Sequence, residues 1–299
     1  MVFIEIIKVI LLGIVEGITE WLPVSSTGHI LLFDEVFPLQ IATSDGARSA
    51  AFMETFKVVI QFGAILAVVL LFWKKLFPLK LQKNSAKNNN EKEGKMQLVA
   101  DMGILNLWGK VLVACLPAAI LGLLFDDILE KYLQTPFVIS LTLILYGVAF
   151  IVIENRNKNK DLPIKTTADI SYKQALLIGA FQVLSLIPGT SRSGATILGA
   201  LLIGVDRPAG SEFTFFLAIP VMLGASALKI LKFFLDFGWF SGVELGYILI
   251  AMTVAFVVSM LAVKFLMNFV KKHDFKVFGW YRIALGVLVI ATMVVPSLF

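Results

Sequence analysis

The feature that most constrains this chain is a set of long apolar runs with few or no charged residues. Six of them reach the roughly 17 to 25 residues that a helix needs to cross a bilayer, at about 56–73, 105–125, 137–153, 213–235, 245–263 and 278–295. Of the 299 residues 58% are hydrophobic and only 16% are charged, far from the composition of soluble domains. The pattern excludes an ordinary soluble globule and predicts an all-α integral membrane protein with six transmembrane helices.

Two further apolar stretches are interrupted by polar and helix-breaking residues. Residues 1–33 contain Glu16 and Glu20 ahead of a proline, and residues 174–205 contain a Pro-Gly pair followed by Arg192. Neither stretch makes a good continuous span, because a charge or a break in the middle is costly in lipid. Each stretch is therefore expected to form two short helices joined by a break.

The distribution of lysine and arginine orients the spans. Basic residues crowd the loops at 74–110, 154–173 and 264–282, whereas the loops at 34–54, 126–131 and 236–244 are acidic or sparsely charged. Because basic loops stay on the cytoplasmic side, counting spans makes 174–205 a re-entrant hairpin that enters and leaves by the cytoplasmic face. Residues 1–33 end at an outer loop, either as a re-entrant hairpin from the outer face or as a full span.

An internal repeat favours the re-entrant hairpin for residues 1–33. At an offset of 166, five small or polar residues match: Gly13 with Gly179, Glu16 with Gln182, Ser25 with Ser191, Thr27 with Ser193, and Gly28 with Gly194. Each half would then be a broken hairpin followed by three spans, and because three is odd the halves have opposite orientations. Such an inverted-topology repeat predicts a polar site near the midplane, where the hairpins meet.

The expected units follow from this repeat. The first covers residues 1–153, with a re-entrant hairpin at 1–33, three spans and a flexible cytoplasmic loop at 74–104 that is rich in Asn, Lys and Glu. A cytoplasmic connector covers 154–173. The second unit covers 174–299, with a re-entrant hairpin at 174–205 and three spans.

Glu16 and Glu20 are the most informative charges. Their i, i+4 spacing puts both carboxylates on one helix face, and an acid near the bilayer centre costs roughly 2.5 to 3.5 kcal/mol on insertion scales. Close carboxylates repel unless a cation neutralises them. We expect the pair to bind a divalent cation, Mg²⁺ or Ca²⁺; the alternative is a pair of acids solvated at a helix end.

Hydroxyl groups follow the acids at the first break. Ser25, Ser26 and Thr27 precede His29, and a helix restarting here would present free N–H groups to an anion. Ser26 and His29 are three residues apart, a spacing that suits a nucleophile and its base. The alternative is that the hydroxyls only cap the second half-helix.

The second break reads PGTSRSGAT over residues 188–196. Backbone N–H groups, hydroxyls and a guanidinium at the start of an apolar helix form a cradle for an oxyanion, with Arg192 as the bidentate phosphate donor. The alternative for Arg192 is a side chain that reaches the bilayer interface. Gln61 and Glu212, near span ends, are also expected to line the cavity.

These parts together fit an enzyme that hydrolyses a phosphorylated lipid. The other class is a lipid-phosphate flippase or transporter, because inverted repeats with broken helices are a transporter architecture. Ser26 with His29 favours the enzyme, since transport needs neither a nucleophile nor a base. The basic residues form no stripe interleaved with aromatics, so no nucleic-acid partner is expected.

Two motifs carry a family resemblance. EGITEWLPVSSTGH (16–29) and PGTSRSGAT (188–196) resemble the signatures of the bacterial undecaprenyl-diphosphatases, the bacitracin-resistance membrane proteins. The similarity extends to FKVVIQFGAILAVV (56–69), SEFTFFLAIP (211–220) and the pair Tyr281–Arg282. This sequence has Lys57 where family members carry an acid, and its loop around Asn89 is longer than usual.

The resemblance implies a multi-pass phosphatase of the bacterial inner (cytoplasmic) membrane. It would convert undecaprenyl diphosphate to the monophosphate, recycle the carrier lipid for peptidoglycan synthesis and confer bacitracin resistance, with membrane lipids around it. Carried over by position, the catalytic residues are Glu16, Glu20, Ser26, His29 and Arg192. The expected substrate-binding residues are Ser25, Thr27, Gln182, Gly189, Thr190, Ser191, Ser193 and Thr196.

Two routes for the reaction stay open. In one, Ser26 attacks the phosphorus and His29 takes or relays the proton; in the other, His29 or a carboxylate activates water and Ser26 is a ligand. Because the first hairpin is expected to enter from the outer face, the site is expected to open outward.

Overall fold

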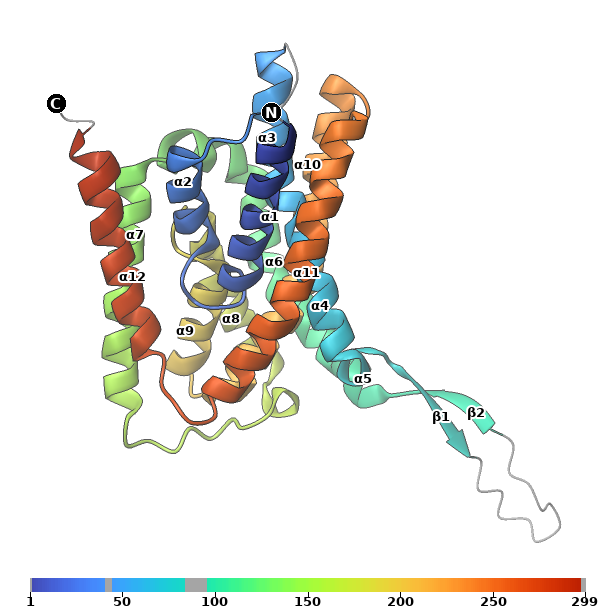
Figure 1. Cartoon of the computed structure of the whole chain (residues 1–299). Helices are drawn as coiled ribbons and strands as arrows, with labels where there is room; N and C mark the ends of the chain where they lie inside the picture. Colours follow the sequence, from blue (N-terminus) through green and yellow to red (C-terminus); the bar gives the residue numbers. More distant parts are fainter. Residues whose placement is uncertain (1, 41–44, 84–95, 297–299) are drawn as a thin grey trace, which may run out of the picture.

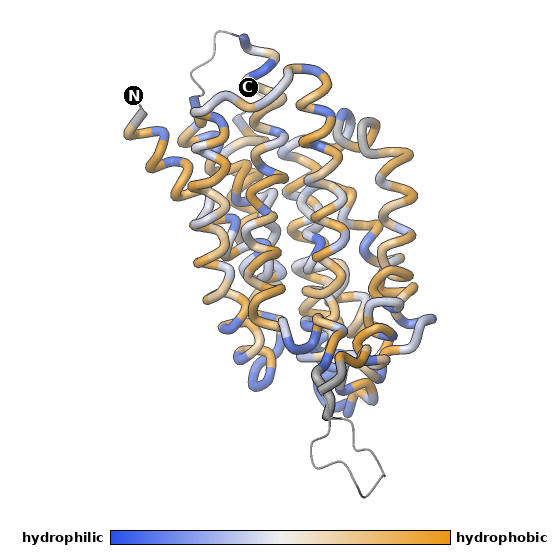
Figure 2. Tube along the Cα trace, turned by 90° about the vertical axis from the view of Figure 1, so that its right-hand side faces the viewer, coloured by the Kyte–Doolittle hydropathy of each residue, from blue (hydrophilic) through white to orange (hydrophobic). Residues whose placement is uncertain are grey.

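The computed structural model describes residues 2–40, 45–83 and 96–296. It is a bundle of helices from which one small β-ribbon projects at one end (Figure 1). Hydrophobic residues run along the middle of the bundle and hydrophilic residues gather toward its two ends (Figure 2). The molecule therefore has the hydropathy profile of a protein that crosses a membrane.

Within the described ranges, six helical segments are long and apolar enough to cross a bilayer, as the sequence predicts. They are Gly46–Leu71, Met102–Phe125, Pro136–Asn157, Arg207–Phe237, Gly242–Phe269 and Lys276–Val294. Most begin earlier or end later than the apolar runs, because helix geometry continues into amphipathic turns beyond the apolar segment. The chain is a multi-pass, all-α membrane protein.

The first half begins with α1 (Val2–Thr19), a break, and α2 (Ser26–Val36). The first span is made of α3 (Gly46–Val59) and α4 (Gln61–Leu71), followed after the ribbon by α6 (Met102–Leu133) and α7 (Pro136–Asn157). Thr135 caps α7 by accepting a hydrogen bond from Val138 N, ahead of a proline at the first helical position, where its missing N–H costs nothing.

The second half repeats this order. A 3₁₀ turn, η1 (Thr167–Asp169), leads to α8 (Tyr172–Val183), the turn η2 (Leu184–Leu186), a break, and α9 (Arg192–Leu202). The spans α10 (Arg207–Phe237), α11 (Gly242–Phe269) and α12 (Lys276–Val289) follow, and the π-turn η3 (Ile290–Val294) extends the last one. Capping boxes start α8 at Ser171 and α11 at Ser241.

Each hairpin packs against a span of the other half. Helix α1 lies on α11, and α8 lies on α6. A Cβ added to Gly13 would lie 2.8 Å from the carbonyl oxygen of Ala251, and one added to Gly179 would lie 2.1 Å from that of Ala114. The glycines that match at an offset of 166 thus allow the same close approach in both halves. That the hairpins are re-entrant, and the unit boundaries, stay predictions.

The predicted loop at 74–104 contains secondary structure that was not expected from the sequence. Helix α5 (Trp73–Leu76) leads into β1 (Leu79–Lys83), which pairs antiparallel with β2 (Met96–Ala100), Leu79 opposite Ala100. Leucine alternates with polar residues in LKLQK, a pattern that favours extended structure, and MQLVA contributes the apolar residues that pair with it. In the prediction this signal was outweighed by the composition of the residues between the two strands. Residues 84–95 of this predicted loop lie outside the described residues.

Candidate active site

The two helix breaks have the same backbone conformation. Ser25 precedes α2 with φ 74° and its Oγ accepts from Gly28 N at 3.4 Å; Ser191 precedes α9 with φ 69° and its Oγ accepts from Gly194 N at 3.2 Å. A positive φ is costly for a residue with a Cβ, so the surrounding structure must hold it. Ser25 and Ser191 are therefore capping residues, as the alternative interpretation of the hydroxyls has it.

An ion pair between Glu20 and Arg192 joins the breaks. Arg192 Nη2 and Nε donate to Glu20 Oε1 at 3.1 and 3.3 Å, and Nη1 donates to the carbonyl of Thr214 at 3.0 Å. Both side chains are about nine-tenths buried, and the guanidinium lies 5.7 Å from the ring centre of the fully buried Trp21. The two predicted charges thus meet in the interior, and Arg192 does not extend to the interface.

Ser26 is held by the same carboxylate. Its hydroxyl donates to Glu20 Oε2 at 3.2 Å, so Glu20 contacts Ser26 with one oxygen and Arg192 with the other. The expected pairing of Ser26 with His29 is not the one observed here. The side chain in contact with Ser26 is the Glu20 carboxylate, because the chain returns at the break and brings α2 back over the end of α1.

His29 has two other partners. Its Nδ1 lies 2.7 Å from the carbonyl oxygen of Ser25 and its Nε2 lies 2.6 Å from the hydroxyl of Tyr281. Since a carbonyl only accepts, Nδ1 carries the proton and Nε2 accepts from Tyr281. The two rings are stacked, with centres 5.5 Å apart and planes 7° apart. His29 lies on α2, as Ser26 does, and its ring is oriented by Tyr281 of the last span.

Glu16 is fully buried. Neither of its carboxylate oxygens accepts a hydrogen bond from the described residues, and it is close enough to Glu20 and Arg192 to interact with both electrostatically. The matched residue Gln182 is 1% exposed, and both its amide atoms are also without partners in the described part of the chain. An unpartnered buried carboxylate is costly, so Glu16 fits a bound cation.

The hydroxyls of the second break bind protein groups. Ser193 Oγ donates to the carbonyl of Glu20 at 3.0 Å and lies 3.2 Å from Ser191 Oγ. Thr196 Oγ1 donates to the carbonyl of Arg192 at 2.9 Å and accepts from Thr214 Oγ1 at 2.9 Å. The Ser193 hydroxyl thus connects the second break to the first, and the Thr196 hydroxyl stabilises the backbone at Arg192.

Gly189 and Thr190 lie in the tight part of the second break. Gly189 has φ 85°, and a Cβ there would lie 2.2 Å from Thr142 Oγ1 on α7, so only glycine fits. The Thr190 side chain is fully buried. Both residues were expected to bind substrate, and here both offer backbone carbonyls to the protein.

Those carbonyls bind Arg282, which the sequence analysis did not include in the site. Arg282 is fully buried in α12; its Nη2 donates to Gly189 O and Thr190 O, both at 2.9 Å, and its Nη1 donates to Pro23 O at 3.3 Å. One guanidinium therefore holds both breaks. The available signal was an arginine inside a predicted span, where a charge indicates function by default.

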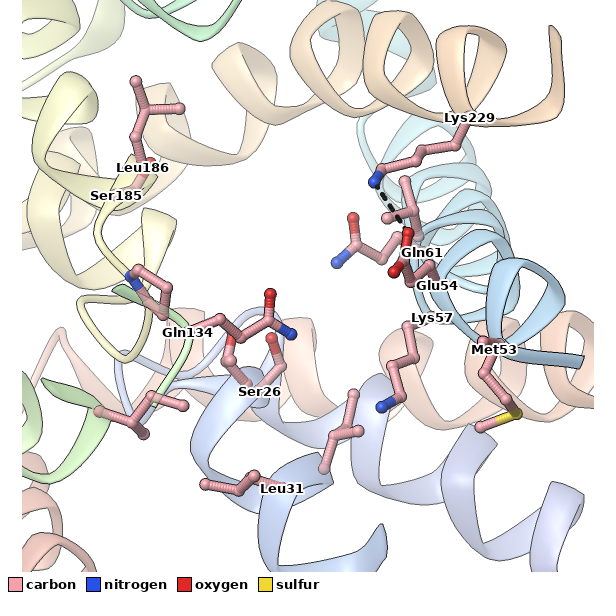
Figure 3. A pocket seen from close by; sticks show the side chains of 16 residues that line it. Ser26, Leu31, Met53, Glu54, Lys57, Gln61, Gln134, Ser185, Leu186 and Lys229 are labelled. Carbon is pink, nitrogen blue, oxygen red and sulfur yellow. Dashed lines mark ion pairs between the residues drawn. The ribbon is translucent and has the colours of Figure 1, made fainter. Parts of the chain in front are cut away.

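A cavity of about 560 Å³ opens beside Ser26 and Thr27. Across from Ser26 and Gln134, its wall carries Glu54, Lys57 and Gln61 of the first span and Lys229 of α10 (Figure 3). Its remaining walls are formed by Ile30, Leu31, Ala50, Met53, Val58, Ile139, Ser185, Leu186 and Pro188.

The cavity's charges are paired. Lys57 pairs with Asp34, and Lys229 Nζ lies 3.6 Å from Glu54 Oε2. Gln61 lines the cavity as expected, whereas Glu212 pairs with Lys75 at 2.6 Å, away from it.

A bundle with six spans and a buried acid–guanidinium pair at two helix breaks defines a multi-pass membrane protein with an intramembrane polar site. The family described as Bacitracin resistance protein BacA matches residues 9–288, and the chain belongs to this family.

Curated relatives match along almost the whole chain. An undecaprenyl-diphosphatase of Enterococcus faecalis is 61% identical over 288 residues, covering 96% of this chain and 97% of the relative. An undecaprenyl-diphosphatase of Desulfitobacterium hafniense is 52% identical over 291 residues (97% and 96%), and one of Streptococcus thermophilus is 47% identical over 296 residues (99% and 96%).

Proposed function

We propose that this protein hydrolyses undecaprenyl diphosphate to undecaprenyl phosphate and inorganic phosphate in the bacterial cell membrane. Relatives with up to 61% identity carry the name undecaprenyl-diphosphatase, and the family name connects it with bacitracin resistance. The product is the carrier lipid of peptidoglycan synthesis, so the activity recycles that lipid. The observation that carries the proposal is the position of Glu20 between Arg192 and Ser26, the one of these three residues that lines the cavity.

Arg192 and the start of α2 bind the diphosphate. A guanidinium pairs with two phosphate oxygens at once, and the first turn of α2 offers N–H groups and the positive end of a helix dipole to the terminal phosphate. Most of the rate comes from stabilising the charge that spreads over the transferred phosphoryl group. The negative substrate takes over part of the interaction that Arg192 makes with Glu20.

Ser26 is the proposed nucleophile and Glu20 its base. The Oγ–P bond forms, the bond from the terminal phosphorus to the bridging oxygen breaks, and undecaprenyl phosphate leaves with that oxygen. The proton of Ser26 passes to Glu20 Oε2, its hydrogen-bond partner. Water then attacks the phosphoserine, which releases inorganic phosphate and returns the proton to Ser26. In the alternative route, Glu20 or His29 activates water directly and Ser26 only binds the phosphate.

Glu16 and Glu20 are the proposed holders of a divalent cation, Mg²⁺ or Ca²⁺. The described residues contain no cluster of three or more His, Cys, Asp or Glu side chains that could hold an ion. Two carboxylates with water and substrate phosphate oxygens suit Mg²⁺, which usually keeps several waters. The chemistry supplied there is neutralisation of phosphate charge. The orphaned oxygens of Glu16 support this assignment.

We further propose that the cavity opens to the outer face of the membrane. The lysine-rich end of the molecule, which carries the ribbon, is assigned to the cytoplasmic side because basic loops stay there. A cysteine in place of Thr27, which is exposed and lines the cavity, should react in a Cys115→Ser background with a membrane-impermeant reagent applied from outside. Labelling from the inside alone would overturn this orientation.

Phosphate release from undecaprenyl diphosphate by the purified protein in detergent tests the function, because a micelle has no second compartment. We expect release with the wild type and its loss with Arg192→Ala. Arg156→Ala, in the last turn of α7, is the control and should release phosphate normally. Lipid movement in vesicles without release in detergent would instead support a flippase.

A further inference from the structure

The β-ribbon formed by β1 and β2 stands away from the helices (Figure 1). An isolated pair of strands is at best marginally stable in water, and independent stability needs a third strand or a surface that covers one face. The ribbon is tied at its base by an ion pair between Lys80 and Asp101 and by a 2.6 Å hydrogen bond from Asp101 N to Pro78 O. Because the ribbon has only two strands and lies away from the helices, we expect another surface to cover one of its faces.

The described base of the ribbon has an apolar face. Leu79 pairs with Ala100, and Leu98 is two residues before Ala100, so these three share one face because side chains alternate along a strand. Leu79 is 40% exposed and Leu98 63% exposed. Lys80 and its partner Val99 lie on the other face. The exposed leucines thus form an apolar face that nothing in the described chain covers fully.

The ribbon starts at the level of the bilayer interface. Its two legs leave from the ends of spans, after Leu71 and before Met102. Trp73 and Phe77 stack at the root with ring centres 4.6 Å apart, and both are at least 40% exposed. Exposed aromatic side chains at span ends are typical of the headgroup region. A membrane surface is consequently within reach of both leucines.

The charge of the segment complements an anionic surface. Residues 74–101 contain seven lysines and three acidic residues, and Lys74 is exposed next to Trp73. Basic segments next to a span are attracted to anionic lipids, and an apolar face with basic neighbours lies in the interface plane. Lipid headgroups therefore match both the apolar and the charged character of the ribbon.

We propose that the ribbon lies on the anionic lipid surface of the protein's own bilayer, with Leu79 and Leu98 at the boundary of headgroups and acyl chains and the exposed Lys74 near lipid phosphates. This interaction is separate from the proposed hydrolysis and does not depend on it. It anchors the connection between the first and second spans to the membrane.

Site-specific fluorescence tests the proposal. In a Cys115→Ser background, Leu98→Cys and Val99→Cys carry an environment-sensitive dye in nanodiscs of phosphatidylglycerol or of phosphatidylcholine. In phosphatidylglycerol we expect the dye at 98 to be quenched by aqueous acrylamide severalfold less than the dye at 99, and to be quenched by a lipid-borne quencher. In phosphatidylcholine the difference should shrink, because the attraction is electrostatic.

Several results would overturn the proposal. Equal acrylamide quenching at 98 and 99 in phosphatidylglycerol excludes an inserted leucine face, and equal protection of 98 in both lipids excludes an anionic partner. Protection in detergent that grows with protein concentration identifies a second copy instead. Replacing Lys74 and Lys83 with glutamine should reduce the protection at 98 and leave phosphate release unchanged. Unchanged protection would contradict the role of charge.

Discussion

Ser25 and Ser191, 166 residues apart, adopt the same left-handed conformation and cap their helices with the same hydrogen bond. Their φ angles differ by a few degrees, 74° and 69°. They are the only non-glycine residues with positive φ in the described ranges. Two equivalent turns from opposite halves therefore face each other, and the acid of one meets the arginine of the other.

Glu20→Gln is expected to lower kcat for phosphate release roughly 10²- to 10⁴-fold, the usual contribution of a general base. The amide keeps the shape of the side chain but neither accepts the Ser26 proton nor neutralises Arg192. Initial rates against lipid concentration measure kcat and KM. Glu212→Gln, which removes an ion pair with the exposed Lys75 outside the cavity, is the control and should keep kcat within a few-fold. Similar losses in both variants would contradict a specific role for Glu20.

Ser26→Ala is expected to abolish rapid phosphate release, and the wild type should yield a trapped phosphoserine at this position after acid quench. Mass spectrometry of the quenched protein detects the modification. Ser185→Ala is the control, because Ser185 also lines the cavity but donates to the carbonyl of Gln182. Near-normal turnover by Ser26→Ala would exclude Ser26 as the nucleophile and would favour the route in which an activated water attacks the phosphorus.

Tyr281→Phe should lower kcat by roughly 2- to 12-fold, because one net hydrogen bond contributes about 0.5–1.5 kcal/mol. The stacking of the two rings is retained, and only the hydroxyl that holds His29 Nε2 is lost. Steady-state rates and the thermal unfolding temperature in detergent are measured together. An unchanged kcat with a lowered unfolding temperature would show that the contact serves stability alone.

Arg282→Lys is expected to destabilise the protein by about 3 kcal/mol or more, since hydrogen bonds to a charged group contribute roughly 1.5–3 kcal/mol each and lysine does not reach three carbonyls. The fold-decrease in kcat should be larger than the fold-decrease in the fraction of folded protein. The reason is that Arg282 holds the backbone of both breaks, which shift when its hydrogen bonds are lost. Denaturant unfolding and phosphate release per folded molecule separate the two effects. Arg207→Lys, which weakens a buried pair with Glu154, should lower stability without lowering kcat of the folded fraction.

Removal of divalent cations with a chelator is expected to stop phosphate release, and added Mg²⁺ or Ca²⁺ should restore it. Glu16→Gln should raise the cation concentration for half-maximal activity, because one of two carboxylate ligands is lost. Calorimetric titration of the cation into the protein without lipid provides a readout besides activity. Full release after exhaustive chelation would exclude a cation from the reaction.

The spans, and a polar site formed where the two breaks meet, could be predicted from the sequence, whereas the ion pair between Glu20 and Arg192 was not predicted. Apolar length determines a span, and the parity of basic loops, with the repeat, brings the two breaks to one place. The partner of Ser26 could not be predicted, because it depends on how the chain returns at the break and which carboxylate that turn brings close.

Arg282 was missed for a related reason. Its contacts to Pro23 and to Gly189 span 259 and 93 residues, and no local pattern encodes them. The ribbon was missed because the composition of the loop outweighed two five-residue strands. The position of Arg282 and the formation of the ribbon both depend on contacts between residues that are far apart in the sequence, or on the pairing of two strands.

The contacts of Arg282 also bear on how the protein is made. Pro23, Gly189 and Thr190 leave the ribosome and reach the membrane before α12 does, yet their carbonyls are held by a guanidinium on α12. Until that helix is inserted, three carbonyls at membrane depth lack this donor, and such groups are costly there. The two breaks therefore gain the donor that they share only when the last span of the chain packs against them.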